Sequence, residues 1–337
     1  MIVSVCRATV PLAALALVTA VVTGCGGPGG DTARATASPA VSPSATVSSA
    51  GPASHSPSAG TGHGAGGKFT GYVTLPASAS GRTPVFQHGP RARGGKNGDG
   101  GGGGGQDKLV ALTFNTVMSP EDEKGAAAGK AGEKKAEGAG NTADGARHDN
   151  PALIAALRRE KVPATVFMTG VWARSYPHQA RAIGSDPLFE VAGHSYSHHA
   201  FAPDCRDLPE LASDKQLADV RKGLAAIRAA GVENPAPYFR FPGGCHDDRS
   251  RRALAPSGVT AVAGDVLGGD AGASDAEAVA ERVLTDVRPG SVVILHCDRG
   301  RAPVTEQAVR RIVPELRKRG YRLVRVSELI ASAMGRS

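Results

Sequence analysis

The stretch VAGHSYSHHA, residues 191–200, shows most directly how this chain is built. It continues a mostly apolar run at residues 188–191 and carries two histidines four positions apart, His194 and His198. In a helical turn or a tight loop, this spacing places both imidazoles on one side, where they can bind one metal ion. Two histidines with this spacing are also common as ordinary surface or core residues, so the interpretation depends on the rest of the chain.

Outward from this stretch, apolar runs alternate with helical patterns. Seven runs are predicted as strands: 109–114, 164–169, 188–191, 238–241, 259–263, 291–295 and 322–326. Strand–helix alternation predicts an α/β fold, a parallel sheet with helical cover. Seven strands suggest a closed or nearly closed barrel, one strand short of the usual eight; an open doubly wound sheet is the alternative.

Clusters of polar residues lie at or just after the ends of five of these strands. These residues are Asn115 and Thr116; His194 and His198; Arg240, Pro242 and Gly243; Asp265 and Asp270; and His296. Each has an ordinary explanation when taken alone, as a surface ion pair, a turn residue or a core histidine. In barrels of parallel strands, however, the chemistry collects at the carboxyl ends of the strands. Five clusters at five such ends therefore predict one shared site.

The rest of the chain predicts an exported protein on a tether. Residues 1–24 have the apolar core and small-residue end of an export signal, and Val22-Thr23-Gly24-Cys25 resembles the lipobox of bacterial lipoproteins. A plain secretory signal cut elsewhere is the alternative. Lipidation of Cys25 would anchor the protein at the extracellular face of the plasma membrane. Residues 25–83 are rich in Ser, Thr, Ala, Pro and Gly, which predicts a disordered linker.

Residues 84–332 are predicted to form one large domain, with flexible insertions near 94–107 and 120–149. The net charge of +8 does not indicate nucleic acid in an exported protein. It fits attraction to anionic wall polymers or to a membrane surface, or simply solvated helix faces. Outside the leader, Cys205, Cys245 and Cys297 remain. Cys205 and Cys245 both follow site loops, so we expect them to form a disulfide with Cys297 free; cysteine ligands to a metal are the rival interpretation.

The ordered set of clusters resembles the polysaccharide deacetylases of the NodB-homology type, carbohydrate esterase family 4, over about residues 84–332. The resemblance implies a distorted (β/α)7 barrel and a metal-dependent hydrolase acting on carbon–nitrogen bonds other than peptide bonds. Such enzymes remove N-acetyl groups, and in some branches O-acetyl groups, from cell-wall or extracellular glycan. Peptidoglycan or a chitin-like glycan is the partner that the resemblance implies.

The resemblance also implies roles for individual residues. His194 and His198 match the pair that binds a divalent metal such as Zn²⁺. Arg240-Phe241-Pro242-Gly243 matches Arg-x-Pro-Tyr, whose arginine orients the catalytic base and whose last backbone N–H helps to bind the oxyanion. Ile294-Leu295-His296 matches Leu-x-His, whose histidine is the general acid, and the aspartate that tunes it falls on Asp270 or, as a weaker match, on Asp265.

The first family motif is where this sequence departs. The family reads Thr-Phe-Asp-Asp or Thr-Phe-Asp-Ala-Asp, whereas this chain reads Thr113-Phe114-Asn115-Thr116-Val117. Asn115 replaces the base aspartate, and Thr116, or Val117 in the second alignment, replaces the metal-binding aspartate. A neutral amide cannot take a proton from water at neutral pH, and loss of a general base costs about 10²- to 10⁴-fold in rate. Weak metal binding follows, because two imidazoles are fewer than the three protein ligands usual for catalytic zinc.

Two functions therefore remain open at this point. The first is a weakened metal-dependent deacetylase in which Glu121, Asp122 or Asp149 supplies the missing carboxylate. The second is a catalytically impaired family member, a surface lipoprotein that binds glycan or a partner without turnover. The altered first motif favours the second function. The other motifs favour the first, because a site without any chemical task has no reason to retain them.

Overall fold

The computed structural model describes residues 71–91, 108–125 and 147–335. The predicted export signal, Cys25 and the linker up to residue 70 lie outside these ranges, as do residues 92–107 and 126–146. Among the described residues, no helix has the length and apolarity needed to cross a membrane.

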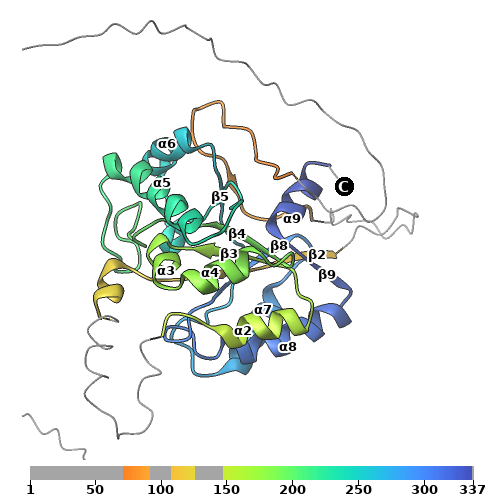
Figure 1. The fold of residues 1–337 in the computed structure, drawn as a ribbon. Helices are drawn as coiled ribbons and strands as arrows, with labels where there is room; N and C mark the ends of the chain where they lie inside the picture. Colours follow the sequence, from red (N-terminus) through yellow and green to blue (C-terminus); the bar gives the residue numbers. More distant parts are fainter. Residues whose placement is uncertain (1–70, 92–107, 126–146, 336–337) are drawn as a thin grey trace, which may run out of the picture. The chain divides into compact units, whose positions relative to one another are not determined.

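The described part is built on one parallel sheet whose strands run in the order β1-β6-β5-β4-β3-β2-β8-β7, with β9 paired to β2 beside β3 (Figure 1). The strands are β1 Val85–Phe86, β2 Lys108–Asn115, β3 Ala164–Met168, β4 Phe189–Gly193, β5 Tyr238–Phe239, β6 Thr260–Val262, β7 Val266–Leu267, β8 Ser291–His296 and β9 Tyr321–Val324. All seven predicted strands are present, and β1 and β7 form the ends of the path. This curled parallel sheet with helical cover is the NodB-like (β/α) architecture that the sequence predicts.

Helices and short 3-10 turns connect the strands. They are α2 Pro151–Arg159, α3 Gly170–Ser175, α4 Pro177–Gly184, α5 Ser213–Ala229, η2 Pro242–Gly244, α6 Asp248–Leu254, η3 Ala255–Ser257, α7 Ala276–Asp286, α8 Thr305–Lys318 and α9 Val326–Ala333. Several begin with a side chain that accepts a hydrogen bond from the first turn; Asn150 does so for α2, and Asp247 forms a capping box for α6.

Strand β2 shows how the two faces of the sheet are used. Seven of its eight residues are buried, as expected for a central strand of a parallel sheet. Val110, Leu112 and Phe114 point outward into the core shared with α2, α7 and α8. Leu109 and Ala111 point inward, into a second cluster that includes α9. Because side chains alternate along a strand, the inward set continues to Asn115 at the carboxyl end.

The folded part begins earlier than the predicted boundary at residue 84. Val73 is buried, and its carbonyl accepts a hydrogen bond from the Tyr238 hydroxyl at 3.0 Å. The backbone N–H of Leu75 donates to Thr260 Oγ1 at 2.9 Å. The composition of this stretch resembles a linker, yet its few apolar residues suffice to pack it on the sheet. The linker prediction is therefore too long at its carboxyl end.

The predicted insertion at 120–149 is structured at both ends. Residues 120–125 are helical, and Asp149 is buried at the start of α2. Glycine content argued for a mobile loop, but capping and ion pairs order these flanks: Ser119 N–H donates to Asp122 Oδ2 at 2.8 Å, and Arg147 pairs with Asp149 at 2.9 Å.

Candidate active site

The strand register brings the predicted site residues together at the carboxyl edge of the sheet. Asn115 at the end of β2 is directly opposite His296 at the end of β8, and on its other side it is opposite Phe167 of β3. The same row continues from Phe167 to Ala192 of β4, two residues before His194. Parallel neighbours lie about 4.8 Å apart, so the first, second and last of the predicted clusters converge.

Arg240 lies in the middle of this group and is buried. Its Nη1 donates to Asn115 Oδ1 at 3.0 Å and to Thr113 Oγ1 at 2.7 Å, and its Nε donates to the Val262 carbonyl at 3.1 Å. Its guanidinium stands 4.0 Å from the centre of the Phe167 ring. Thus Arg240 does contact the position of the family's base, as the resemblance implies.

What Arg240 lacks is a carboxylate. The partners of its side chain, the Val262 carbonyl, Thr113 and Asn115, are neutral, and its buried Nη2 has no hydrogen-bond partner. Burial lowers the pKa of Arg240 to about 9. A buried unsatisfied donor costs about 1–3 kcal/mol, more if it is charged. Arg240 would therefore suit an anionic partner at position 115, and the neutral amide of Asn115 does not supply one.

His194 and His198 are held as neutral imidazoles. His194 Nδ1 lies 2.8 Å from the Arg240 carbonyl, which can only accept, so Nδ1 carries the proton and Nε2 keeps its lone pair. The His198 backbone is in the left-handed region at φ 58°, and its N–H donates to Ser195 Oγ at 2.8 Å. Burial lowers the pKa of His194 well below its usual value and that of His198 to about 3. The two rings lie 5.0 Å apart, centre to centre.

The third ligand position is neutral as well. Thr116 is buried, and its Oγ1 accepts a hydrogen bond from the Thr169 N–H at 3.2 Å. Val117 is apolar and also buried. Within the described ranges, no group of three or more His, Cys, Asp or Glu side chains is arranged to hold a metal ion. The residues present therefore do not fit the three-ligand set of a catalytic zinc site.

The three acidic residues expected to replace the missing carboxylate are all otherwise engaged. Asp122 accepts two hydrogen bonds from Arg301 Nη2, at 2.7 and 2.8 Å. Asp149 is buried and pairs with Arg147 and Gln179. Glu121 is exposed, with one carboxylate oxygen 3.9 Å from His199 Nε2. In this arrangement none of them takes the place of an aspartate at position 115 or 116.

His296 and Asp270 form a hydrogen-bonded pair, as the resemblance predicts. Asp270 Oδ1 lies 2.8 Å from His296 Nδ1, and Asp270 Oδ2 accepts from the His296 backbone N–H at 2.7 Å and from Thr305 Oγ1 at 2.6 Å. Burial alone would raise the pKa of Asp270, but these hydrogen bonds outweigh it and the pKa is lowered. An ionised Asp270 fixes the proton of His296 on Nδ1 and orients the ring, and the mostly buried imidazole leaves Nε2 free of Asp270.

Asp265 lies elsewhere. Its carboxylate accepts from the Val292 N–H at 2.7 Å and from Ser291 Oγ at 2.8 Å, and it pairs with Arg91 at 2.5 Å. Ser291 and Val292 are at the amino end of β8, whereas His296 is four residues after Val292, roughly 13 Å along the strand. The structure thus leaves Asp270 beside His296 and uses Asp265 to join the loop after β6 to the start of β8.

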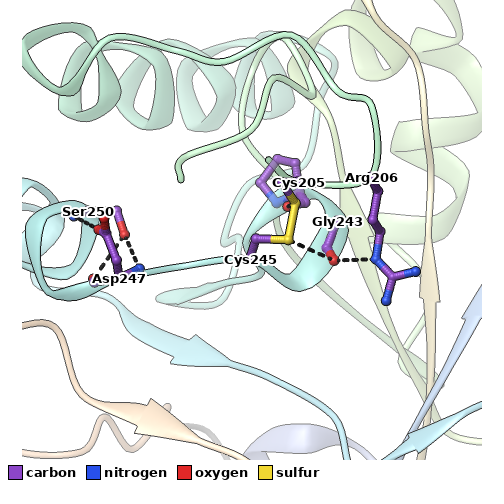
Figure 2. The surroundings of a disulfide bond; sticks show 7 residues. Cys205, Arg206, Gly243, Cys245, Asp247 and Ser250 are labelled. Carbon is purple, nitrogen blue, oxygen red and sulfur yellow. Dashed lines mark hydrogen bonds between the residues drawn. A yellow bond between two sulfur atoms is a disulfide. The ribbon is translucent and has the colours of Figure 1, made fainter. Parts of the chain in front are cut away.

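The cysteines form the predicted pair. Cys205 and Cys245 are joined by a disulfide with Cα atoms 5.9 Å apart, and Cys297 is free and buried. Burial raises the pKa of Cys297 to about 12, which disfavours the nucleophilic thiolate. The disulfide lies directly against Gly243, the residue expected to supply an oxyanion N–H (Figure 2).

Sequence reasoning overlooked three residues that support the site. Thr113 bridges Arg240 and the Val293 carbonyl, Phe167 lies against the guanidinium of Arg240, and Thr305 donates to Asp270. Thr113 could have been found, because it is two residues before Asn115 and so faces inward like it. Phe167 and Thr305 read as an ordinary core residue and an ordinary helix start.

Comparisons with known proteins agree with this geometry. The family model for polysaccharide deacetylase matches residues 140–262. A chitooligosaccharide deacetylase from Sinorhizobium fredii (strain NBRC 101917 / NGR234) is 29% identical over 181 residues, 51% of this chain and 80% of that protein. A peptidoglycan-N-acetylglucosamine deacetylase from Bacillus cereus (strain ATCC 14579) is 28% identical over 182 residues, 53% of this chain and 81% of that protein.

Among solved structures, a carbohydrate esterase family 4 pseudoenzyme from Bacillus anthracis has the same fold. The two superpose with a TM-score of 0.53 at 20% identity, covering 76% of this chain and 70% of that one. The chain has the curled parallel sheet, and its histidine pair and Asp270–His296 pair follow each other in the order of the family's motifs. This chain is therefore similar to the polysaccharide deacetylases of the NodB-homology type, and its residues 140–262 match their family model.

Proposed function

We propose that this protein binds N-acetylated glycan at the edge of the sheet, and that its deacetylation is slowed by at least the 10²- to 10⁴-fold that a missing general base costs. The observation that carries this proposal is the hydrogen bond from the buried Arg240 to Asn115, where an aspartate is needed. The relatives named as chitooligosaccharide and peptidoglycan deacetylases support the substrate class.

The residues present can perform only part of the hydrolysis. His296, held by Asp270, is placed to give a proton to a leaving amine. The backbone N–H of Gly243 is the expected donor to the oxygen of the acetyl group. Asn115 Oδ1 already accepts from Arg240 and, as a neutral amide oxygen, cannot take a proton from water. A complete family site would also use a divalent metal to polarise the acetyl carbonyl and acidify water, but the described donors do not form its ligand set.

Glycan binding and acetate release, measured on the same preparation, test this function. We expect oligomers of N-acetylglucosamine to bind more tightly than the same oligomers without acetyl groups. We also expect acetate release to be at least about 10²-fold slower than in a relative with both aspartates. Wild-type turnover within tenfold of such a relative would contradict the proposal.

A full deacetylase that recruits Asp122 is the second candidate. Asp122 lies near enough to His198 to raise the pKa of that imidazole against the larger effect of burial. Its helix follows β2 directly, and it would have to leave Arg301 to act. In that case Asp122→Asn would abolish turnover, whereas Glu123→Gln, on the same helix, would not. If Asp122 only positions Arg301, the two variants would release acetate at the same low rate.

We further propose that the protein is exported and held at the extracellular face of the membrane through Cys25, which lies outside the described residues. The lipobox-like Val22-Thr23-Gly24-Cys25 supports this proposal. The low-complexity residues that follow would let the folded part reach glycan beyond the membrane.

A further inference from the structure

A disulfide beside the expected oxyanion donor is the feature that the proposed function does not use. Cys245 is two residues after Gly243, and Cys205 comes from the loop that follows the histidine pair. Figure 2 shows the two sulfur atoms beside the Gly243 backbone. Arg206, from the loop that carries Cys205, contacts the Gly243 carbonyl. We propose that the Cys205–Cys245 disulfide and Arg206 form a clamp that orients the Gly243 N–H toward bound glycan.

The contacts of the Pro242–Gly243 peptide give the direction of this N–H. The Pro242 carbonyl oxygen lies 3.7 Å from Cys205 Sγ. The described backbone contains no cis peptide bond, so the C=O and N–H of this peptide point in opposite directions. With the carbonyl turned toward the disulfide, the Gly243 N–H points away from it. A disulfide sulfur has no hydrogen to donate, so the contact acts by packing rather than by hydrogen bonding.

The next peptide is fixed from two sides. Arg206 Nε donates to the Gly243 carbonyl at 2.8 Å, and Cys245 Sγ lies 3.7 Å from the same oxygen. Both peptides that flank the Gly243 Cα therefore have their carbonyls held by the clamp. Rotation of the Gly243–Gly244 peptide would break the Arg206 contact and also the turn hydrogen bond from the Gly244 N–H to the Phe241 carbonyl at 2.9 Å.

The clamp also explains why residue 243 is glycine instead of the tyrosine of the family motif. Gly243 has φ +64°, in the left-handed region, and a Cβ on it would lie 2.5 Å from Cys205 Sγ. No side chain fits there while the disulfide is formed. The loop that brings Cys205 into place is itself strained, because Asp204, Arg206 and Asp207 all have positive φ. A covalent bond holds this loop where local preferences would not.

The role of the clamp in glycan binding rests on the proposed function, whereas its effect on the backbone can be tested without glycan. Its first measurement, amide exchange in the peptide spanning residues 240–247, needs no glycan. We compare the full chain with its disulfide intact, the same protein after reduction, and Cys205→Ser/Cys245→Ser. Arg206→Gln loosens the clamp without touching the disulfide, Arg206→Lys retains a donor, and Arg252→Gln, an exposed arginine of α6, is the matched control.

We expect exchange in this peptide to become at least about tenfold faster on reduction or in the serine pair, and by a smaller factor in Arg206→Gln. The control should match wild type. The second measurement is the Kd for an N-acetylglucosamine tetramer, which should rise at least about fivefold in the same variants and recover in Arg206→Lys. A purely structural disulfide would lower Tm and leave the Kd unchanged.

Unchanged exchange after reduction overturns the clamp, as does a Kd within twofold of wild type in both Arg206→Gln and the serine pair. If the wild-type protein binds no glycan, the proposed function fails. The exchange measurement then still decides whether the disulfide and Arg206 hold this backbone.

Discussion

Arg240 Nη1 donates to Asn115 Oδ1 at 3.0 Å, and the second Nη nitrogen of the same buried guanidinium has no partner. This relationship separates the chain from a complete deacetylase site more clearly than any single substitution in the sequence. A buried guanidinium with one unused donor suits a carboxylate partner. The side chain that they orient cannot ionise.

The first prediction concerns stability at this contact. Asn115→Asp should raise the free energy of unfolding at pH 7 by about 1–3 kcal/mol, the value of hydrogen bonds to a charged group, because the carboxylate can accept from both Nη nitrogens. The pKa of the new aspartate would be depressed by Arg240. Its stabilisation is therefore present above the unfolded value of about 3.9 and is lost as the pH falls through the folded value.

Urea unfolding at pH 7 and at pH 3 measures both effects. Asn115→Leu is the matched variant. It removes an acceptor from Arg240 and should lower the free energy of unfolding. An aspartate variant that is no more stable than wild type at pH 7 would show that Arg240 is satisfied in another way.

The second prediction concerns Glu190, a buried carboxyl far from solvent in the strand β4. Its Oε1 accepts from Thr165 Oγ1 at 2.9 Å, but its buried Oε2 has no partner. Burial raises its pKa above the ordinary 4.5. Stability is thus greatest below that ordinary value and declines as the pH rises through the raised folded value, because the buried group must then ionise.

Glu190→Gln keeps the shape and does not titrate. It should raise Tm at pH 8 by roughly 2–4 °C, the effect of about 1 kcal/mol in a domain of this size, and by less at pH 5. Calorimetry at the two pH values compares the gains. An equal gain at both would mean that Glu190 does not change its protonation in this range.

The third prediction concerns metal binding. With His194 and His198 as the only family ligands retained, wild-type protein should lose zinc to a competing chelator, and His194→Ala should weaken binding further. Thr116→Asp should tighten it by at least about tenfold by restoring an anionic ligand. His178→Ala, an exposed histidine of α4, is the control. Tight stoichiometric zinc that survives His194→Ala would place the metal elsewhere.

The fourth prediction concerns anchoring. Cys25→Ala should release the protein from the membrane or block its processing, since the acyl chains would have no attachment point. Fractionation of cells that express each form, with mass spectrometry of the mature amino terminus, measures both results. Protein that stays in the membrane fraction and is cut at the same bond would exclude Cys25 as the lipid site.

Much of the fold could be predicted because long apolar strands and their helices leave strong patterns. All seven predicted strands are found, whereas β1 and β7 have only two residues each and leave no periodic signal. The packing of Val73 was hidden in linker-like composition, and it depends on Tyr238, far away in the sequence. Strand ends alone could not distinguish Asp265 from Asp270, because which aspartate reaches His296 depends on the path of the loop around β7.

The sequence predicted which residues lie together at the candidate site, but it did not predict their ion pairs and hydrogen bonds. The resemblance placed Arg240 beside residue 115, and the disulfide pairing followed from two loops that meet. The orphaned Nη2 of Arg240 and the Asp122–Arg301 pair are tertiary facts that no spacing encodes. In this structure they leave Asp122 bonded to Arg301 and Arg240 without a carboxylate partner.

Acetate release by Asn115→Asp combined with Thr116→Asp, or with Val117→Asp, tests the central claim most directly. Asn115→Asp alone should add little, because the third ligand is still missing. The double variant should release acetate from N-acetylglucosamine oligomers at least about tenfold faster than wild type, part of a general base's contribution, and bind zinc more tightly. Adding His296→Ala should remove the gain. Double variants that fold, bind zinc tightly and still release no acetate from any N- or O-acetylated glycan would contradict the claim that only these two carboxylates separate this site from a deacetylase.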